Sequence, residues 1–342
     1  MSLLGGESNH FGLDIGENQV RLVQLKGGPG KYSLAAFGSA AIPAGVAQSD
    51  SKLDRQKLAK IITELISSAQ VDTKNVVSAI PGTSVFNALV KLPPMTQSEL
   101  AKAIKYQAEQ NIPLKIDDVK YDWQVIRQDP NTKETTVMII AAAKSKISSM
   151  MQLFSYAELN VIALETATVA MARSLAAQDD PLVLILDIGS TTTEIAVVER
   201  GTLMQTRSFP LAGFGMTRAI SQNLGLDAEQ AEQFKQRFGL SQDKLEGQVF
   251  KTIEPILRNI LDEAVRSSKY YQEQFGKEIK KVVLTGGSSR LPMISEYIKS
   301  YMGTEVAFGN PWKNISYGSS FNDKLNEIAP EFATAVGLAM RD

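Results

Sequence analysis

The residues Leu-Asp-Ile-Gly occur twice in this chain, about half its length apart, and both copies stand in the same context. The first lies within HFGLDIGENQVRLVQL and the second within LILDIGSTTTEIAVV. In each, an aliphatic run precedes the motif and alternating apolar residues follow it. This pattern is typical of a strand, a tight turn and a second strand. The pattern predicts two halves with the same opening, in which Asp14 and Asp187 stand at matching turns.

The segments around the two hairpins predict an α/β protein. Residues 54–69 place apolar side chains on one helical face, and residues 76–82 indicate a buried strand, so a helix should cover a sheet. Residues 160–176 predict a strand followed by an alanine-rich helix. After the second hairpin comes a helical block, including a long amphipathic pattern from Leu245 to Phe275 that Pro255 interrupts.

Between the two halves, residues 83–158 have a separate pattern of predicted strands and helices. The segments FNALVKLP, YDWQVI and TTVMIIAAA predict strands, and a helix should begin at Thr96, where Thr96 and Glu99 form a capping box, and end before Pro113. A second, methionine-rich helix follows. We interpret this stretch as a small α/β subdomain inserted in the first half.

Composition narrows the function classes. The chain has 342 residues, 44% of them hydrophobic, enough for two domains of ordinary size. Its 36 basic and 37 acidic residues do not favour a nucleic-acid binder or a polybasic membrane anchor. Without cysteine and with only His10, the chain can form no disulfide, thiolate metal site or histidine-rich metal centre. No apolar run approaches the roughly 20 residues of a membrane span, and the start lacks signal-peptide features, so we expect a cytoplasmic protein.

Each Asp-Ile-Gly turn has the groups to bind a metal–phosphate complex. A carboxylate beside a glycine can hold a hydrated divalent cation while backbone NH groups approach phosphate oxygens. In the second copy, three hydroxyl residues add donors: Ser190, Thr191 and Thr192. One such turn alone is equally an ordinary hairpin. Two in matching contexts predict that the turns grip one triphosphate from both sides, with Asp14 and Asp187 sharing the metal.

A third glycine-rich element, VVLTGGSSRLPMI, places Gly286, Gly287 and Ser288 between a strand and a helix. Backbone without side chains can approach a base or ribose closely there, and Ser288 is expected to cap the helix. A plain strand–helix turn is the alternative. Neither GGPGKYS nor GFGMTR has the spacing of a P-loop or a dinucleotide fingerprint.

In chain order, these three motifs resemble the first phosphate, second phosphate and adenosine motifs of the actin-like ATPase superfamily. The inserted stretch, with AIPGTSVFNALVKLPPM and KYQAEQNIPLKIDDVKYDWQV, resembles the PilM family of type IV pilus assembly, in the FtsA-like branch. The resemblance spans the chain and implies an α/β actin-like ATPase fold, two duplicated lobes around a nucleotide cleft with an FtsA-type inserted subdomain. The resemblance also implies a division of the chain. Lobe one would consist of residues 1–82, completed by 159–181 and 325–342, with the inserted subdomain at 83–158. Lobe two would consist of residues 182–215, completed by 276–324, with a helical subdomain at 216–275.

The resemblance implies which residues hold Mg²⁺ and ATP. Asp14 and Asp187 match metal-associated acids. In AEQFK, Glu232 would bind ribose and Lys235 would lie near the nucleotide, although an exposed helical pair at i and i+3 is the alternative. The full set of implied nucleotide-binding positions is Asp14, Gly16, Asn18, Asp187, Gly189, Ser190, Thr191, Thr192, Gly213, Gly215, Glu232, Lys235, Gly286, Gly287 and Ser288.

Two acids stand apart from that set. Glu165, in LETATVAMA, falls where several relatives place a water-orienting acid, which makes it a general-base candidate; an acid at a helix amino terminus is the alternative. Glu17 departs from the family, whose members usually carry small hydroxyl residues after the first Asp-Ile-Gly. A carboxylate there would repel a triphosphate unless it points away.

The resemblance thus implies an ATP-binding scaffold that signals by changing conformation, with at most slow ATPase activity. Its implied partner is the cytoplasmic amino-terminal tail of the membrane protein PilN, held beside the insert, which would recruit the chain to the inner face of the membrane; the pilus motor ATPases are further implied partners. A small-molecule kinase of the same superfamily is one alternative. An FtsA-like division protein is another, but such proteins usually end in an amphipathic membrane helix, whereas this sequence ends in FATAVGLAMRD.

Overall fold

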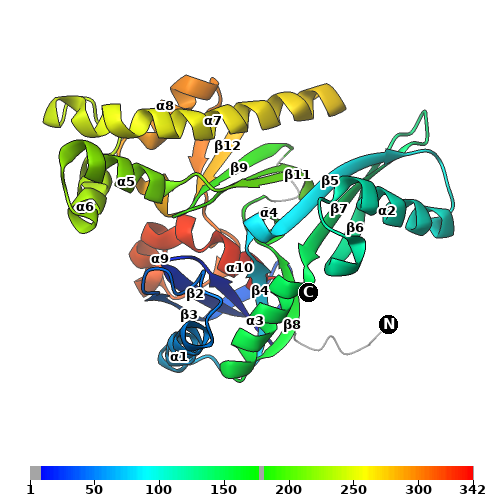
Figure 1. The fold of residues 1–342 in the computed structure, drawn as a ribbon, viewed down its shortest axis with the longest axis horizontal. Coiled ribbons are helices and arrows are strands. Elements are labelled where there is room, and N and C mark those ends of the chain that lie inside the picture. Colours follow the sequence, from blue (N-terminus) through cyan, green and yellow to red (C-terminus); the bar gives the residue numbers. More distant parts are fainter. Residues whose placement is uncertain (1–8, 177–180, 342) are drawn as a thin grey trace.

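The first Leu-Asp-Ile-Gly hairpin forms the centre of lobe one, shown in the lower part of Figure 1. The computed structural model describes residues 9–176 and 181–341, so the expectation for the extreme amino terminus lies outside the described residues. The sheet has the order β14-β3-β2-β1-β4-β8. Its strands are β1 (Phe11–Ile15), β2 (Gln19–Lys26), β3 (Tyr32–Ala41), β4 (Asn75–Ile80), β8 (Asn160–Thr166) and β14 (Ile315–Ser316). β1 pairs antiparallel with β2 and parallel with β4, which places the hairpin turn at one edge of the cleft.

Helices cover both faces of this sheet. They are α1 (Lys52–Ser68), α3 (Lys144–Tyr156), α4 (Ala167–Leu175), α9 (Asn322–Ile328) and α10 (Ala333–Ala339). Apolar residues of α1 and α3 pack with β1 and β2 on one face, while α9 and α10 pack on the other. His10, which precedes β1, is buried there beside the carbonyl oxygen of Leu338, as expected of a residue with a structural role.

Lobe two repeats the arrangement around the second hairpin, with the sheet order β11-β10-β9-β12-β13. Its strands are β9 (Val183–Ile188), β10 (Thr193–Glu199), β11 (Thr202–Phe209), β12 (Lys281–Thr285) and β13 (Glu305–Phe308); its helices are α5 (Gly213–Leu224), α6 (Ala228–Phe238), α7 (Gln248–Phe275) and α8 (Ile294–Met302). β9 pairs antiparallel with β10 and parallel with β12, as β1 does with β2 and β4. The two hairpins therefore occupy equivalent places, as the repeated motif predicts. The long helix α7, at the top of Figure 1, continues through Pro255.

The inserted subdomain, at the right of Figure 1, is an antiparallel sheet with the order β5-β7-β6 and a helix on one face. Its elements are β5 (Val85–Leu92), α2 (Gln97–Asn111), β6 (Val119–Gln128) and β7 (Thr135–Ala143). The capping box of Thr96 and Glu99 begins α2, and the helix ends before Pro113, which confirms both sequence predictions. Leu89 and Ile126 of this sheet pack against the core of lobe two.

Two segments pack differently from the expected division. The insert was predicted to run from 83 to 158, but Met150 and Phe154 of α3 pack in the lobe-one core, so the inserted sheet ends with β7. Lobe two was predicted to extend to residue 324, but β14 pairs with β3 and the buried Trp312 packs in lobe one. In both cases tertiary packing decides the lobe to which the segment is joined. Within 9–176 and 181–341, no helix is both long and apolar enough to cross a membrane.

Candidate functional site

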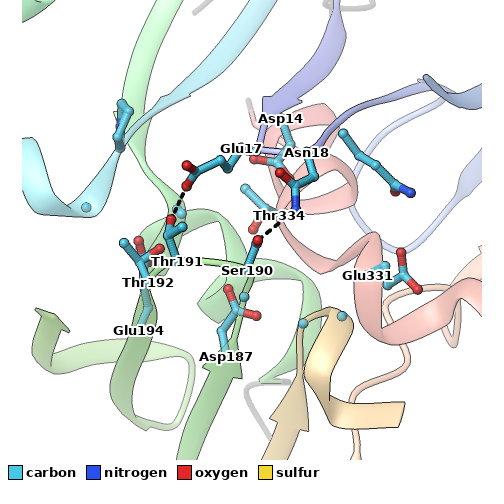
Figure 2. A pocket seen from close by; sticks show the side chains of 18 of the residues that line it. Asp14, Glu17, Asn18, Asp187, Ser190, Thr191, Thr192, Glu194, Glu331 and Thr334 are labelled. Carbon is cyan, nitrogen blue, oxygen red and sulfur yellow. Dashed lines mark hydrogen bonds between the residues drawn. The ribbon is translucent and has the colours of Figure 1, made fainter. Parts of the chain in front are cut away.

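A cavity of about 1150 Å³ lies between the two lobes, and both hairpin turns line it (Figure 2). Residues from β12, the turn that follows it, and α6 also line it. Most of the predicted nucleotide-binding residues are brought together here: Asp14, Gly16, Asn18, Asp187, Gly189, Ser190, Thr191, Thr192, Glu232, Lys235, Gly286, Gly287 and Ser288. Gly213, Gly215 and Glu165 do not line this cavity.

Three carboxyl groups give this cavity an acidic floor. Burial raises the pKa of Asp14, although Arg21, 3.9 Å away, opposes the shift. Burial and then the charge of Asp14 raise the pKa of Asp187 to about 7. Burial and then the charges of the two aspartates raise the pKa of Glu194 to about 8. A cation at this place would relieve the repulsion among the three groups.

This acidic floor suits a hydrated magnesium ion better than an ion held by protein ligands alone. Among the residues that the structure describes, no group of three or more acidic or histidine side chains is arranged to hold a metal. Mg²⁺ usually keeps several waters and binds one or two carboxylates together with phosphate oxygens. Asp14 and Asp187 would supply those carboxylates, and a phosphate chain would supply the remaining charge.

The tips of the two hairpins touch across the cleft. The side-chain amide of Asn18 donates a hydrogen bond to the hydroxyl of Ser190 over 2.8 Å, and the hydroxyl of Thr191 donates to the carboxylate of Glu17 (Figure 2). Glu17 therefore points toward lobe two. The sequence predicted its charge to be a liability near phosphate but gave no indication of this contact.

The turn after β12 approaches the second hairpin very closely. Gly286 has a φ of +86°, and a Cβ atom there would lie 2.2 Å from Oδ1 of Asp187, so only glycine fits. The expected helix cap at Ser288 is wrong, because residues 287–290 form a short 3-10 helix and α8 begins only at Ile294. The hydroxyl of Ser288 donates instead to the carbonyl oxygen of Gly189 over 3.2 Å. This bond joins the third motif to the second.

Lys235 and Glu232 form an ion pair at i and i+3 of α6, in which Lys235 is buried and the side chain of Glu232 is 40% exposed. The ammonium group of Lys235, which is only 6% exposed, donates to the carbonyl oxygen of Gly213 over 3.1 Å, to the hydroxyl of Thr217 and to Glu232 over 2.8 Å. Burial works against ionisation of Glu232, but hydrogen bonds from Lys235 and Thr217 lower its pKa on balance. Gly213 thus supports the site from behind the cavity wall, whereas Gly215 faces Leu211 and Ile256.

Glu165 does not fit the predicted role of general base. Its carboxylate is buried and binds Arg173 through both oxygens, over 2.7 and 2.9 Å, and binds Arg341 over 2.5 Å. Both of its oxygens therefore accept hydrogen bonds from arginines. Glu165 is not among the residues that line the cavity, and we assign it a structural role instead.

Two acidic residues of the cavity were missed by the sequence prediction. Glu194, on β10, also accepts a backbone hydrogen bond from Gly82, at the start of the connection to the insert. Glu331 binds Arg21 of lobe one over 2.9 Å and Arg290 of lobe two over 3.4 Å. The charge of Glu194 within the otherwise buried segment TEIAVV could have revealed it. No sequence pattern distinguishes Glu331, because its partners come from distant segments.

Comparison with known proteins identifies the family of this chain. A family model described as type IV pilus assembly protein PilM matches residues 12–342. The cell division protein FtsA of Neisseria meningitidis is 25% identical over 279 residues, 71% of this chain and 66% of that protein. FtsA of Escherichia coli K12 is 27% identical over 183 residues, 46% of this chain and 42% of that protein. The chain thus spans less than two thirds of the length of these relatives.

Solved structures agree in fold. The chain resembles a PilM-PilN type IV pilus biogenesis complex with a TM-score of 0.84 and 26% identity, over 98% of this chain and 99% of that one. MreB 5 of Spiroplasma citri, bound to AMPPNP, gives a TM-score of 0.54 at 12% identity, over 97% and 95% of the two chains. Together with the paired sheets, these likenesses confirm the predicted actin-like fold.

Proposed function

Because this chain belongs to the PilM family of type IV pilus assembly proteins, we propose that it is an ATP-binding scaffold of a pilus assembly machine. The observation that carries the nucleotide part is the pair of Leu-Asp-Ile-Gly hairpins, which face each other across one cavity from equivalent places in two sheets. Such a pair can grip a phosphate chain from both sides. The nucleotide state would then set the relation between the lobes.

Within this cleft we assign the ligand groups as follows. Asp14 and Asp187 hold a hydrated Mg²⁺, which neutralises phosphate charge when it is bound. The backbone of both turns and the hydroxyls of residues 190–192 donate to phosphate oxygens. Glu232, kept ionised by Lys235 and Thr217, is placed to accept ribose hydroxyls. Because Glu165 is fully engaged by arginines, we propose that turnover is slow and that binding carries the signal.

A thermal-shift experiment tests the nucleotide site. A ligand at about 100 times its dissociation constant adds roughly 2.7 kcal/mol to the free energy of unfolding, so Mg-ATP should raise Tm. Asp187→Asn keeps the shape of the side chain but removes its charge, and it should abolish the shift. Asp243→Asn, at an exposed acid outside the cavity, is the control and should leave the shift intact. An undiminished shift in Asp187→Asn would exclude the second hairpin from the site.

For the partner, we propose the cytoplasmic amino-terminal tail of PilN. The support is the 0.84 TM-score to a PilM-PilN complex and an insert that carries no phosphate motif yet has a three-stranded sheet with two edges. An extended peptide can add main-chain hydrogen bonds to a sheet edge, while pockets select its side chains. We propose that this binding recruits the chain from the cytoplasm to the inner face of the membrane and that the motor ATPases are further partners.

Calorimetry with a synthetic PilN tail from the same organism tests this proposal. We expect micromolar or tighter binding, on the order of −8 kcal/mol. Lys120→Glu, an exposed change on the edge strand β6, should weaken binding. Lys280→Glu, equally exposed but in lobe two, should not. If wild type gives no heat and shows no competition, the scaffold assignment fails. A small-molecule kinase of the same superfamily then becomes the leading hypothesis, and phosphorylation of sugars and acyl acids tests it.

The alternative of an FtsA-like division protein is weaker, because the PilM family model matches residues 12–342 whereas the FtsA matches cover less of the chain.

A further inference from the structure

The direct contact between the two hairpin tips uses groups that a phosphate would also use. Thr191 and Ser190 are the donors assigned above to phosphate oxygens, yet Thr191 donates to Glu17, and Ser190 accepts from Asn18 over 2.8 Å. A hydroxyl has a single hydrogen to donate. Thr191 therefore cannot serve Glu17 and a phosphate oxygen at the same time.

The position of this contact in the cleft decides which phosphate meets it. In the assignment proposed above, Glu232 and Lys235 mark the ribose end of the cavity, and the turn at Gly286 approaches Asp187 of the second hairpin. A phosphate chain that starts there runs between the two hairpins toward their tips. The phosphate farthest from the ribose is thus the one that reaches the space bridged by Glu17 and Thr191.

Electrostatic repulsion also disfavours a terminal phosphate at the hairpin tips. Glu17 adds a carboxyl group to a cavity whose three acids, Asp14, Asp187 and Glu194, already repel one another. A terminal phosphate at the tips would have to displace the Glu17 carboxylate from Thr191 and then remain near it. A nucleoside diphosphate ends earlier and leaves the bridge between the lobes in place.

We propose that Glu17 is the residue that distinguishes nucleoside di- from triphosphates in this cleft. The inference rests on the proposed nucleotide-binding function. In the diphosphate state the Glu17–Thr191 contact ties lobe one to lobe two. The triphosphate breaks this tie, because it takes the Thr191 hydroxyl, and the bond from Asn18 to Ser190 is then the remaining contact described between the two tips. The chain thereby carries a built-in penalty against the triphosphate.

Titration calorimetry of the full chain with Mg-ATP and with Mg-ADP tests this assignment. Glu17→Ser should tighten Mg-ATP binding by about tenfold, which corresponds to about 1.4 kcal/mol, and change Mg-ADP binding by less than about twofold. Glu17→Gln, which keeps an oxygen acceptor but loses the charge, should fall between the two. Asp50→Ser removes the same charge from an exposed position outside the cavity and should alter neither affinity.

A double-mutant cycle with Thr191→Val separates the contact from general repulsion. If Glu17 acts through Thr191, the gain from Glu17→Ser shrinks in the Thr191→Val background; an unchanged gain would overturn the contact. Equal tightening of both nucleotides, no change, or weaker Mg-ATP binding in Glu17→Ser would each refute the discrimination while leaving the nucleotide site standing. Failure of wild type and Glu17→Ser to bind either nucleotide would instead refute the proposed nucleotide function itself.

Discussion

Replacing Glu165 distinguishes a structural acid from a catalytic one. Its side chain is 6% exposed, binds Arg173 through both oxygens and also binds Arg341; these two arginine side chains are 28% and 39% exposed. Breaking a buried ion pair typically costs 3–5 kcal/mol because a buried charge is left unpaired. Here water reaches both arginines, so we expect Glu165→Gln to lower the free energy of unfolding by about 3 kcal/mol.

The assay is urea denaturation followed by circular dichroism, with a melting curve beside it. With an unfolding entropy of about 2.1 cal/mol/K per residue over 342 residues, 3 kcal/mol corresponds to roughly 4 °C in Tm. Glu64→Gln removes an acid of the same type from an exposed pair with Lys60 and should change stability by less than about 0.5 kcal/mol. Mg-ATP affinity should survive Glu165→Gln. Unchanged stability combined with lost nucleotide turnover would refute the structural role and restore Glu165 as a base.

Three further outcomes follow from contacts around the cleft and the insert. Lys235→Met leaves Glu232 without its buried cation and should destabilise lobe two by about 2 kcal/mol, measured by urea denaturation, and also weaken Mg-ATP binding. Gly286→Ala would place a Cβ atom 2.2 Å from the Asp187 carboxylate at a φ of +86°, so we expect a loss of Mg-ATP binding in calorimetry together with about 1–3 kcal/mol of strain. Thr96→Ala removes the capping box of α2 and should cost about 1 kcal/mol in denaturation without affecting nucleotide.

Local patterns predicted the parts of this fold that local physics determines. The repeated Asp-Ile-Gly turn, the capping box at Thr96 and the stop before Pro113 depend on residues within a few positions of one another, and all three are present as expected. The cavity collects residues from both hairpins because the motif is repeated in two equivalent sheets. That much of the site could be predicted from the sequence.

What the sequence could not predict depends on partners that lie far away along the chain. Glu165 binds Arg341, which lies 176 positions away along the chain, in addition to the nearby Arg173. Glu17 meets its partner Thr191 only when both lobes have folded, and α3 joins lobe one because its apolar residues pack in one core with those of α1. Residue spacing alone contains none of this information, since each case depends on which of several apolar or charged surfaces pack together.

The packing of the inserted subdomain would couple nucleotide binding in the cleft to peptide binding on the insert. The subdomain leaves lobe one just after Gly82, whose backbone binds Glu194 of lobe two at the cavity wall. Its far side packs on lobe two as well, where the guanidinium of Arg127 lies 5.6 Å from the ring centre of Phe275. A change in the angle between the lobes must therefore shift the insert relative to one of them. Because linkage is reciprocal, a peptide that binds the insert in only one of these arrangements would change nucleotide affinity by the same factor by which nucleotide changes peptide affinity.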